Sequence, residues 1–166
     1  PLDQWQPPFC GDMDLTIKAN GEWWHEGRRM TRQKLIDLFA TVLWREGDAY
    51  FLKTPVEKIG IQVEDVPLFI EEVNLLQLAD GAYIECLTTH QDRIVLDSAH
   101  LLQMRVFQGE LKPYVNIRAN LDARIARHAF YHIVSWCDLQ EDGEHTVLSI
   151  PMGATRQHLS TDNTAF

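Results

Sequence analysis

The chain has 166 residues, 45% of them hydrophobic, which is enough apolar material for one domain or two small ones with an ordinary core. Its 24 acidic residues outnumber the 15 basic ones, and the formal charge of −9 repels a phosphate backbone. Duplex nucleic acid is therefore excluded as a partner, whereas a small nucleotide held by a few arginines is not.

The cysteines and the hydropathy pattern indicate the compartment. Cys10, Cys86 and Cys137 form no CxxC pair, and an odd number of cysteines cannot be fully paired within one chain. We therefore expect a reducing environment. No apolar run approaches the roughly 20 residues that cross a bilayer, and no basic stretch followed by an apolar one marks a signal peptide. These patterns predict a cytoplasmic protein that makes no contact with a membrane.

An early β-hairpin is predicted by the Asn-Gly pair in the segment LTIKANGEWWHEG. Asn-Gly is a strong signal for a two-residue hairpin turn. In the register of such a turn, Leu15, Ile17 and Trp24 share an apolar face. Trp23 and His25 then lie on the opposite, polar face, which we expect to look toward a binding site.

A first helix is predicted directly after this hairpin. From Thr31 onward the apolar period changes to that of a helix, through Leu35, Phe39 and Leu43. Thr31 is a suitable N-cap residue. The pattern predicts a helix over residues 32–45.

The middle of the chain predicts a meandering antiparallel sheet. Turn residues at regular intervals separate short segments that are rich in β-branched and aromatic residues. The predicted strands cover residues 50–54, 56–65, 68–77, 82–89, 93–97, 103–108 and 114–118.

A second helix and a tail complete the predicted elements. Asn120 is a suitable N-cap, and the apolar residues that follow it at helical spacing predict a helix over residues 121–137. A turn and one further strand follow in EDGEHTVLSIP. We expect an N-terminal domain over residues 1–65, a C-terminal domain over 66–150, and a polar tail over 151–166.

The hairpin region also contains residue types that bind metals. Cys10, Asp12, Asp14 and His25 are all possible ligands. Their spacing matches no known ligand pattern, and no second histidine lies nearby. The sequence favours hydrogen-bonding roles for the two aspartates, and we predict no metal site.

Glu57 is an unusual carboxylate, because it shares the strand parity of the apolar residues Ile59 and Ile61. A carboxylate at the edge of a buried face needs a partner or must keep its proton. Two interpretations stay open: a structural ion pair with Arg118 or Arg32, or part of a site.

Three arginines, Arg118, Arg124 and Arg127, lie within ten residues at the predicted junction of a strand and the second helix. Planar donors placed there could face one anion, although solvated surface arginines are the alternative. The sequence has no glycine-rich phosphate loop, no GxSxG and no defensible Ser/His/Asp order. It therefore favours binding over catalysis.

Five blocks of the sequence resemble the bacterial family called domain of unknown function 1285. They are CGDMDLTI, NGEWWHEG, MTRQKLIDLF, YFLKTPVEKIGIQVEDVP and PYVNIRANLDARIARHAFY, and they span residues 9–137. The resemblance implies an α+β fold of two small domains from a duplicated core. It implies antiparallel sheets that each carry a helix, with the second domain superficially similar to a pleckstrin-homology fold.

The resemblance also implies an interdomain site, a nucleotide-like ligand and a role in signal transduction. In this sequence the matching motif positions are Cys10, Asp12, Asp14, Trp23, His25, Arg32, Thr54, Pro55, Glu57, Asp65, Pro67, Tyr114, Arg118 and Arg124.

We expect a small-ligand-binding module whose ligand lies in the cleft between the domains. Aromatic rings there would stack on a base, and the arginines would hold phosphate. The predicted ligand-binding residues are Trp23, His25, Arg32, Thr54, Glu57, Asp65, Tyr114, Arg118 and Arg124.

Two alternatives to this module stay open. One is a hydrolase of a phosphorylated small molecule, in which His25 is the acid or base and Glu57 or Asp14 orients it. The other is a protein-interaction platform on the second domain. We assign no catalytic residue, cofactor or metal.

Overall fold

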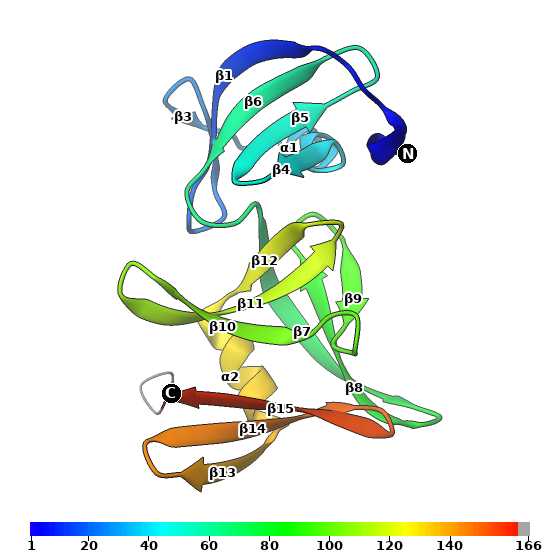
Figure 1. Cartoon of the computed structure of the whole chain (residues 1–166), viewed down its shortest axis with the longest axis vertical. Helices are drawn as coiled ribbons and strands as arrows, with labels where there is room; N and C mark the ends of the chain where they lie inside the picture. The colour runs from blue at the N-terminus through cyan, green and yellow to red at the C-terminus, as the bar shows by residue number, and fades with distance from the viewer. Residues whose placement is uncertain (163–166) are drawn as a thin grey trace. The chain divides into compact units, whose positions relative to one another are not determined.

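The computed structural model describes residues 1–162, and the chain divides into two compact units, Pro1–Pro67 and Leu68–Phe166. Most of the described residues are in β-strands, and two α-helices accompany the two sheets (Figure 1). This is an α+β architecture, as the sequence predicts.

The N-terminal unit contains one sheet and one helix. Its sheet has six strands in the order β3-β2-β1-β6-β5-β4. The elements of this unit are η1 (Leu2–Gln4), β1 (Phe9–Ile17), β2 (Trp23–His25), β3 (Arg28–Arg29), α1 (Gln33–Ala40), β4 (Leu43–Glu46), β5 (Ala49–Lys53) and β6 (Lys58–Val63).

The C-terminal unit contains a larger sheet and the second helix. The sheet follows the order β10-β11-β12-β7-β8-β14-β13 among the described residues, with β9 paired to β8 and β15 paired to β14. The elements of this unit are β7 (Leu68–Leu78), β8 (Gly81–Thr88), β9 (Arg93–Val95), β10 (Leu102–Phe107), β11 (Glu110–Arg118), β12 (Leu121–Ile125), α2 (Arg127–Ser135), β13 (Asp138–Asp142), β14 (His145–Met152) and β15 (Thr155–Asp162).

The first six strands of each unit have the same order and directions. The path β4-β5-β6-β1-β2-β3 in the N-terminal unit corresponds to β10-β11-β12-β7-β8-β9 in the C-terminal unit. In both, the central pair is parallel (β6 with β1, β12 with β7), whereas the other neighbours on this path are antiparallel. The expectation of purely antiparallel sheets is therefore wrong at the centre of each sheet.

The predicted register of the first hairpin is wrong by one residue. Ile17 pairs with Trp23 and Leu15 with His25. The loop has three residues, 19–21, because the Lys18 N–H donates to the Glu22 carbonyl at 2.8 Å and closes the hairpin there. Within the loop, Gly21 has a φ of 90° and donates its N–H to the Lys18 carbonyl at 3.0 Å. A three-residue loop of this kind shifts the strands by one residue, which moves every side chain to the other face.

The faces of the two tryptophans are consequently exchanged. Trp23 is only 2% exposed and shares the core face with Leu15 and Ile17. Trp24 lies on the other face, where its Nε1 donates to Glu22 at 3.2 Å and the Lys18 ammonium lies 5.5 Å from its ring. The apolar face of the hairpin is therefore built by Trp23.

The first helix is shorter than the predicted span of residues 32–45. Its N-cap is Arg32, which makes no side-chain capping bond, and the helix ends at Ala40. Leu43 starts β4 and pairs with Leu52 of β5. Leu43, which the helical period included, is buried in the core but belongs to a strand. Its apolar side chain is therefore not evidence for a longer helix.

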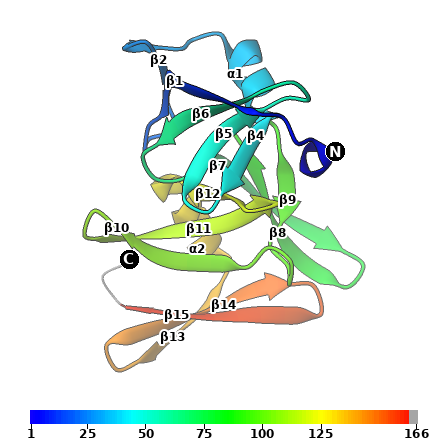
Figure 2. The same ribbon diagram turned by 45° about the horizontal axis from the view of Figure 1, so that its top comes forward.

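The second helix also begins later than predicted. Residues 121–125 form β12, with a burial that alternates along the strand, and Ala123 and Ile125 pair with Leu68 and Ile70 of β7. Asn120 precedes this strand and is not a helix N-cap; α2 starts at Arg127 after Ala126. In two views, α2 lies between the β10–β12 strands and the β13–β15 strands (Figures 1 and 2).

The predicted polar tail over residues 151–166 is largely a strand. Thr155–Asp162 forms β15 and pairs with β14 along its length, whereas residues 163–166 lie outside the described part of the chain. Exposed residues alternate along this strand with the more buried Gln157, Leu159 and Thr161. Because most residues of the segment are polar, its composition hides this period of two.

The Gln157 side chain of β15 is hydrogen-bonded to the edge of β10. The Gln157 amide accepts the Leu102 N–H at 3.0 Å and donates to the Leu102 carbonyl at 2.8 Å, as a neighbouring strand would.

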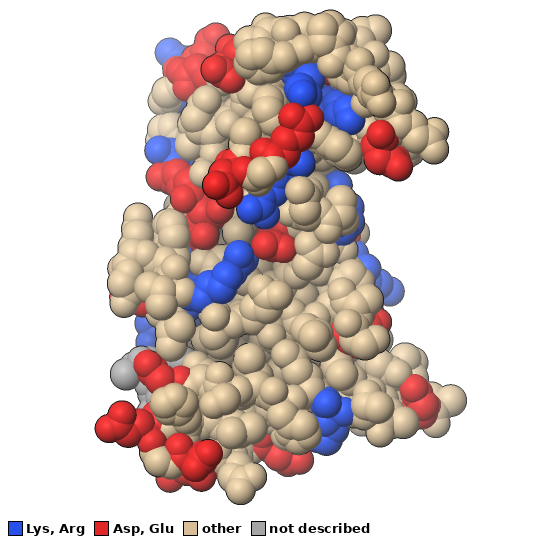
Figure 3. All heavy atoms as spheres, in the orientation of Figure 1, with Lys and Arg blue, Asp and Glu red and all other residues tan. Residues whose placement is uncertain are grey.

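The β13 edge is protected differently, by its own charge (Figure 3). Acidic side chains gather over the β13–β14 hairpin, which contains Asp138, Glu141, Asp142 and Glu144.

The hairpin register can be tested by replacing each tryptophan separately. We expect Trp23→Ala to lower the free energy of unfolding by about 3–5 kcal/mol, because it empties a large core volume. Trp24→Ala should cost about 1 kcal/mol or less, since it removes a partly exposed ring. Urea unfolding of both variants measures the difference. A larger loss of stability in Trp24→Ala than in Trp23→Ala would contradict the register of the structure and support the one predicted from the sequence.

The Gln157 link makes a second prediction. Gln157→Ala leaves the Leu102 N–H and carbonyl without their partner, and we expect a loss of about 1–3 kcal/mol of stability. The matched control is Gln140→Ala on the exposed strand β13. Equal unfolding midpoints for the two variants would contradict a role for Gln157 in holding β10.

Candidate functional site

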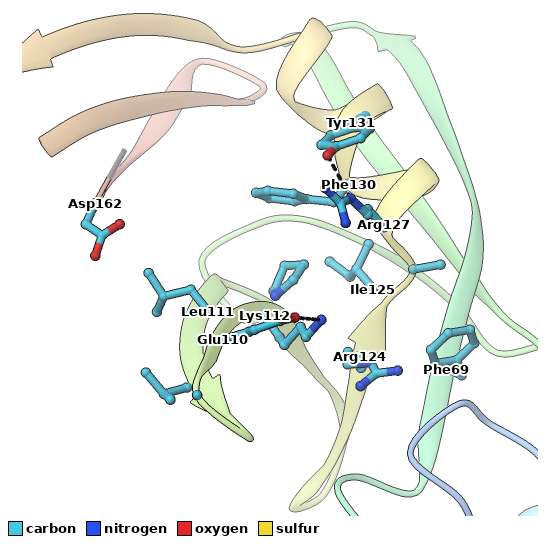
Figure 4. A pocket seen from close by; sticks show the side chains of 14 residues that line it. Phe69, Glu110, Leu111, Lys112, Arg124, Ile125, Arg127, Phe130, Tyr131 and Asp162 are labelled. Atoms are coloured by element: carbon cyan, nitrogen blue, oxygen red, sulfur yellow. Dashed lines mark hydrogen bonds and ion pairs between the residues drawn. The ribbon is translucent and has the colours of Figure 1, made fainter. Parts of the chain in front are cut away.

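A cavity of about 650 Å³ lies within the C-terminal unit, where the β10–β11 hairpin faces the junction of β12 and α2 (Figure 4). This volume is in the range of small-molecule sites. Its lining residues are Phe69, Val106, Gly109, Glu110, Leu111, Lys112, Pro113, Arg124, Ile125, Ala126, Arg127, Phe130, Tyr131 and Asp162.

The β10–β11 hairpin forms one wall of this cavity. Phe107 pairs with Glu110, and the two residues between them, Gln108 and Gly109, have φ values of 50° and 80°. Two central residues with positive φ are typical of the turn that matches the natural twist of a hairpin. The turn places Glu110 and Lys112 on neighbouring positions of one strand face.

The junction between β12 and α2 forms the facing wall. The ladder with β7 ends where the Ala126 N–H donates to the Ile70 carbonyl at 2.8 Å. Ala126 is extended, with a φ of −58° and a ψ of 149°, and the helix begins at the next residue. Arg124 and Arg127 therefore flank the junction, one on the strand and one on the helix.

Each of these two arginines lies over an aromatic ring. The Arg124 guanidinium carbon is 5.4 Å from the centre of the Phe69 ring, and that of Arg127 is 5.5 Å from the Tyr131 ring. The Arg127 Nε also donates to the Tyr131 hydroxyl at 2.8 Å. Cation–π contacts hold the planar donors in defined positions.

A third basic residue of the cavity has an acidic partner. The Lys112 ammonium lies 2.7 Å from Glu110. This hydrogen bond and the charge of Lys112, together with the more distant Arg127, lower the pKa of Glu110. Three basic and two acidic side chains line the cavity, so its walls are cationic on balance in a chain that is strongly acidic.

Tyr114 lies beside this cavity on the same face of the sheet as Lys112 and Arg124. It is directly opposite Arg124 in the β11–β12 ladder, and it is only 2% exposed. The Arg105 guanidinium lies 4.1 Å from its ring and forms an ion pair with Asp122 at 3.2 Å. Tyr114 is thus a buried support under a layer of charged side chains.

Among the nine residues predicted to bind ligand, Arg124 is a member of the cavity lining. Arg127, which the sequence grouped with it, lines the cavity too. Arg118 lies elsewhere in the same unit, where its Nε is 3.3 Å from Asp92 at the β8–β9 turn. Both cavity arginines are therefore close to the β12–α2 junction, whereas Arg118 interacts with another turn.

The predicted residues of the N-terminal unit occupy several positions within that unit. Thr54 and Glu57 close the β5–β6 turn, where the Thr54 hydroxyl accepts the Glu57 N–H at 3.2 Å. Arg32 caps α1 and is exposed, and Asp65 follows β6. Within residues 1–67, Glu57 forms no ion pair with Arg32.

His25 does not have the geometry that the hydrolase alternative requires. Its side chain is 43% exposed and its Nε2 lies 3.9 Å from Glu26. Within residues 1–67, His25 makes no hydrogen bond to Asp14 or Glu57. Trp23, its neighbour two residues before, is buried and offers no open ring.

Residues 1–162 contain neither a cluster of metal ligands nor a helix that could span a membrane. No group of three or more histidine, cysteine, aspartate and glutamate side chains is arranged to hold a metal ion. No helix in this range is long and apolar enough to span a bilayer.

Sequence reasoning missed most of the cavity because its lining comes from β7, β10, β11, β12, α2 and β15. Phe69, Lys112 and Tyr131 are distant in sequence and carry no shared motif. The predicted strands over residues 103–108 and 114–118 and the turn between them indicated the hairpin wall, but they gave no indication of what faces that wall.

The cysteines differ in a way that chemical modification can measure. Burial raises the pKa of Cys86 to about 12 and that of Cys137 to about 11, whereas Cys10 is exposed. Since the thiolate is the nucleophile, iodoacetamide at about pH 8 should modify Cys10 in the native protein and Cys86 after unfolding. Mass spectrometry identifies the sites. Rapid modification of native Cys86 would contradict its burial.

Comparisons with known proteins agree with the resemblance found in the sequence. Residues 1–66 match the family model for the N-terminal domain of DUF1285, a domain of unknown function, and residues 67–154 match the model for its C-terminal domain. No curated protein matches the chain.

Two crystal structures are similar to the chain. A DUF1285 family protein from Silicibacter pomeroyi DSS-3 is 32% identical, with a TM-score of 0.85 over 97% of this chain and 87% of that one. A DUF1285 family protein from Shewanella baltica OS155 is 29% identical, with a TM-score of 0.59 over 73% of this chain and 90% of that one. The chain belongs to the DUF1285 family, with both of the family's domains present.

Proposed function

We propose that this protein binds a small anionic molecule with an apolar or aromatic part in the cavity of its C-terminal unit. The observation that carries this proposal is the pair of arginines at the β12–α2 junction, each positioned by an aromatic ring at the wall of a 650 Å³ cavity. Guanidinium groups bind phosphates and carboxylates through paired hydrogen bonds.

The walls between the charged groups support the apolar part of such a ligand. Ile125 and Phe130 are core residues that also line the cavity, and Pro113 is buried beside them. A nucleotide combines a phosphate with an aromatic base, so it is a member of the class that fits. The setting that we propose is ligand sensing for signal transduction in the cytoplasm.

This proposal moves the expected site from a cleft between the domains to the interior of the second one. Trp23, His25, Arg32, Thr54, Glu57 and Asp65 are not needed for it. The hydrolase alternative is not proposed, because the carboxylate beside His25 is the exposed Glu26 at 3.9 Å, and neither Asp14 nor Glu57 is hydrogen-bonded to the imidazole.

The common strand order supports a further part of the proposal, that the two units arose by duplication of one six-stranded core. In the second unit a helix follows the sixth strand directly. A helix that follows an antiparallel-rich sheet is also the basis of the proposed likeness to a pleckstrin-homology fold. Fold likeness alone assigns no ligand.

Calorimetric titration with nucleoside monophosphates and inorganic phosphate tests the proposed function. We expect Arg124→Ala and Arg127→Ala each to weaken binding by about 10- to 100-fold, because each removes a charge-assisted hydrogen bond worth roughly 1.5–3 kcal/mol. The control is Arg28→Ala on the exposed strand β3, which should bind as the native protein does. Binding that survives both cavity substitutions would place the ligand elsewhere.

A further inference from the structure

We infer that the cavity recognises a ligand with two separate anionic groups joined by an apolar spacer, one group at Arg124 and the other at Arg127. This inference rests on the proposed anion-binding function and specifies its ligand class. The ligand would be a dicarboxylate, a bisphosphate, or a molecule with a carboxylate at one end and a phosphate at the other.

The two arginines are anchored on different elements. Arg124 is directly opposite Phe69 across the parallel β12–β7 pair, and its guanidinium lies over that ring. Arg127 points along its own helix to Tyr131, four residues later, where it forms both a ring contact and a hydrogen bond. The two guanidinium groups are therefore held over separate rings, one on β7 and the other on α2.

The close-up view shows this separation. Arg127 points toward Tyr131 at one end of the cavity, and Arg124 lies at the other end near Phe69, with Ile125 between them (Figure 4). The hydrogen bond to Tyr131 uses the Nε of Arg127 and does not involve its two terminal nitrogens. Each end of the cavity therefore presents its own planar donor.

The surface between the two ends is apolar. Ile125, Ala126 and Phe130 are buried residues of the lining, and the buried Pro113 of β11 also lines the cavity. Lys112 also lies along this stretch, but its ammonium is neutralised by Glu110 at 2.7 Å. A methylene chain or a ring fits this middle section, and a third anionic group would have to displace Glu110.

Binding at two points gives such a ligand a higher affinity than a molecule with one anionic group. Once one end is bound, the second group is held near its arginine at a high effective concentration. The advantage depends on spacer length, because a spacer that is too short cannot reach both sites and a longer one loses the gain gradually. Length dependence is thus the signature of the proposed mode.

The experiment compares linear α,ω-dicarboxylic acids of increasing length with monocarboxylic acids of the same number of carbons. Affinities are measured by calorimetry or by amide NMR shifts of the full chain. We expect one spacer length at which the diacid binds about 100-fold more tightly than its monoacid. Arg124→Ala and Arg127→Ala should each reduce the diacid to the affinity of the monoacid, and the double variant should lose most of the remaining affinity, because neither carboxylate then has an arginine.

Conservative variants keep the test valid if an alanine variant folds poorly. Arg124→Gln and Arg127→Gln retain much of the side-chain stem over Phe69 and Tyr131 while they remove the charge. Arg28→Ala is the matched control, and its affinity for every acid should equal that of the native protein.

Two results would overturn the inference, and they separate it from the proposed function. If monoacids and diacids bind equally at every length, with loss in Arg124→Ala or Arg127→Ala, the cavity binds single anions and the two-point mode is wrong. If no acid, phosphate or nucleotide binds at all, the proposed function fails as well.

Discussion

The parallel hydrogen bonds between β12 and β7 determine where the chain changes from a strand to a helix. They end when the Ala126 N–H meets the Ile70 carbonyl, and α2 begins at the next residue. This pairing buries Ala123 and Ile125 and turns Arg124 to the opposite face, beside Phe69. The positions of both cavity arginines follow from this one ladder.

The same ladder explains which parts of the fold the sequence could predict. Strands β5, β7, β8 and β10 are apparent from β-branched and aromatic residues between clear turns, and the structure has them at nearly the predicted residues. Residues 121–125 were assigned to a helix because their apolar positions fit a helical wheel continuing into α2. In such a short segment, periods of two and 3.6 overlap, and pairing with β7 decides between them.

The candidate site was harder to predict than the fold. Arg124 and Arg127 were identified because they are close in sequence, and local spacing survives folding. Phe69, Lys112 and Tyr131 join them only through the order of strands in the sheet, which no local pattern encodes. The hairpin error had a similar origin: Asn-Gly indicates a turn, but the positive φ of Gly21 within a three-residue loop decided whether Trp23 or Trp24 entered the core.

Gln157 shows how one side chain can make the hydrogen bonds that a neighbouring strand would make to one residue at a sheet edge. Its amide pairs with the backbone of Leu102 as a peptide group would, and β15, which carries it, extends beyond residue 154, where the match to the family model ends. The first residue of β10 is thus paired by a segment outside the region that defines the family. A relative that lacks this segment faces the hazard of edge-to-edge aggregation and must protect β10 by charge, by proline or by association with another chain.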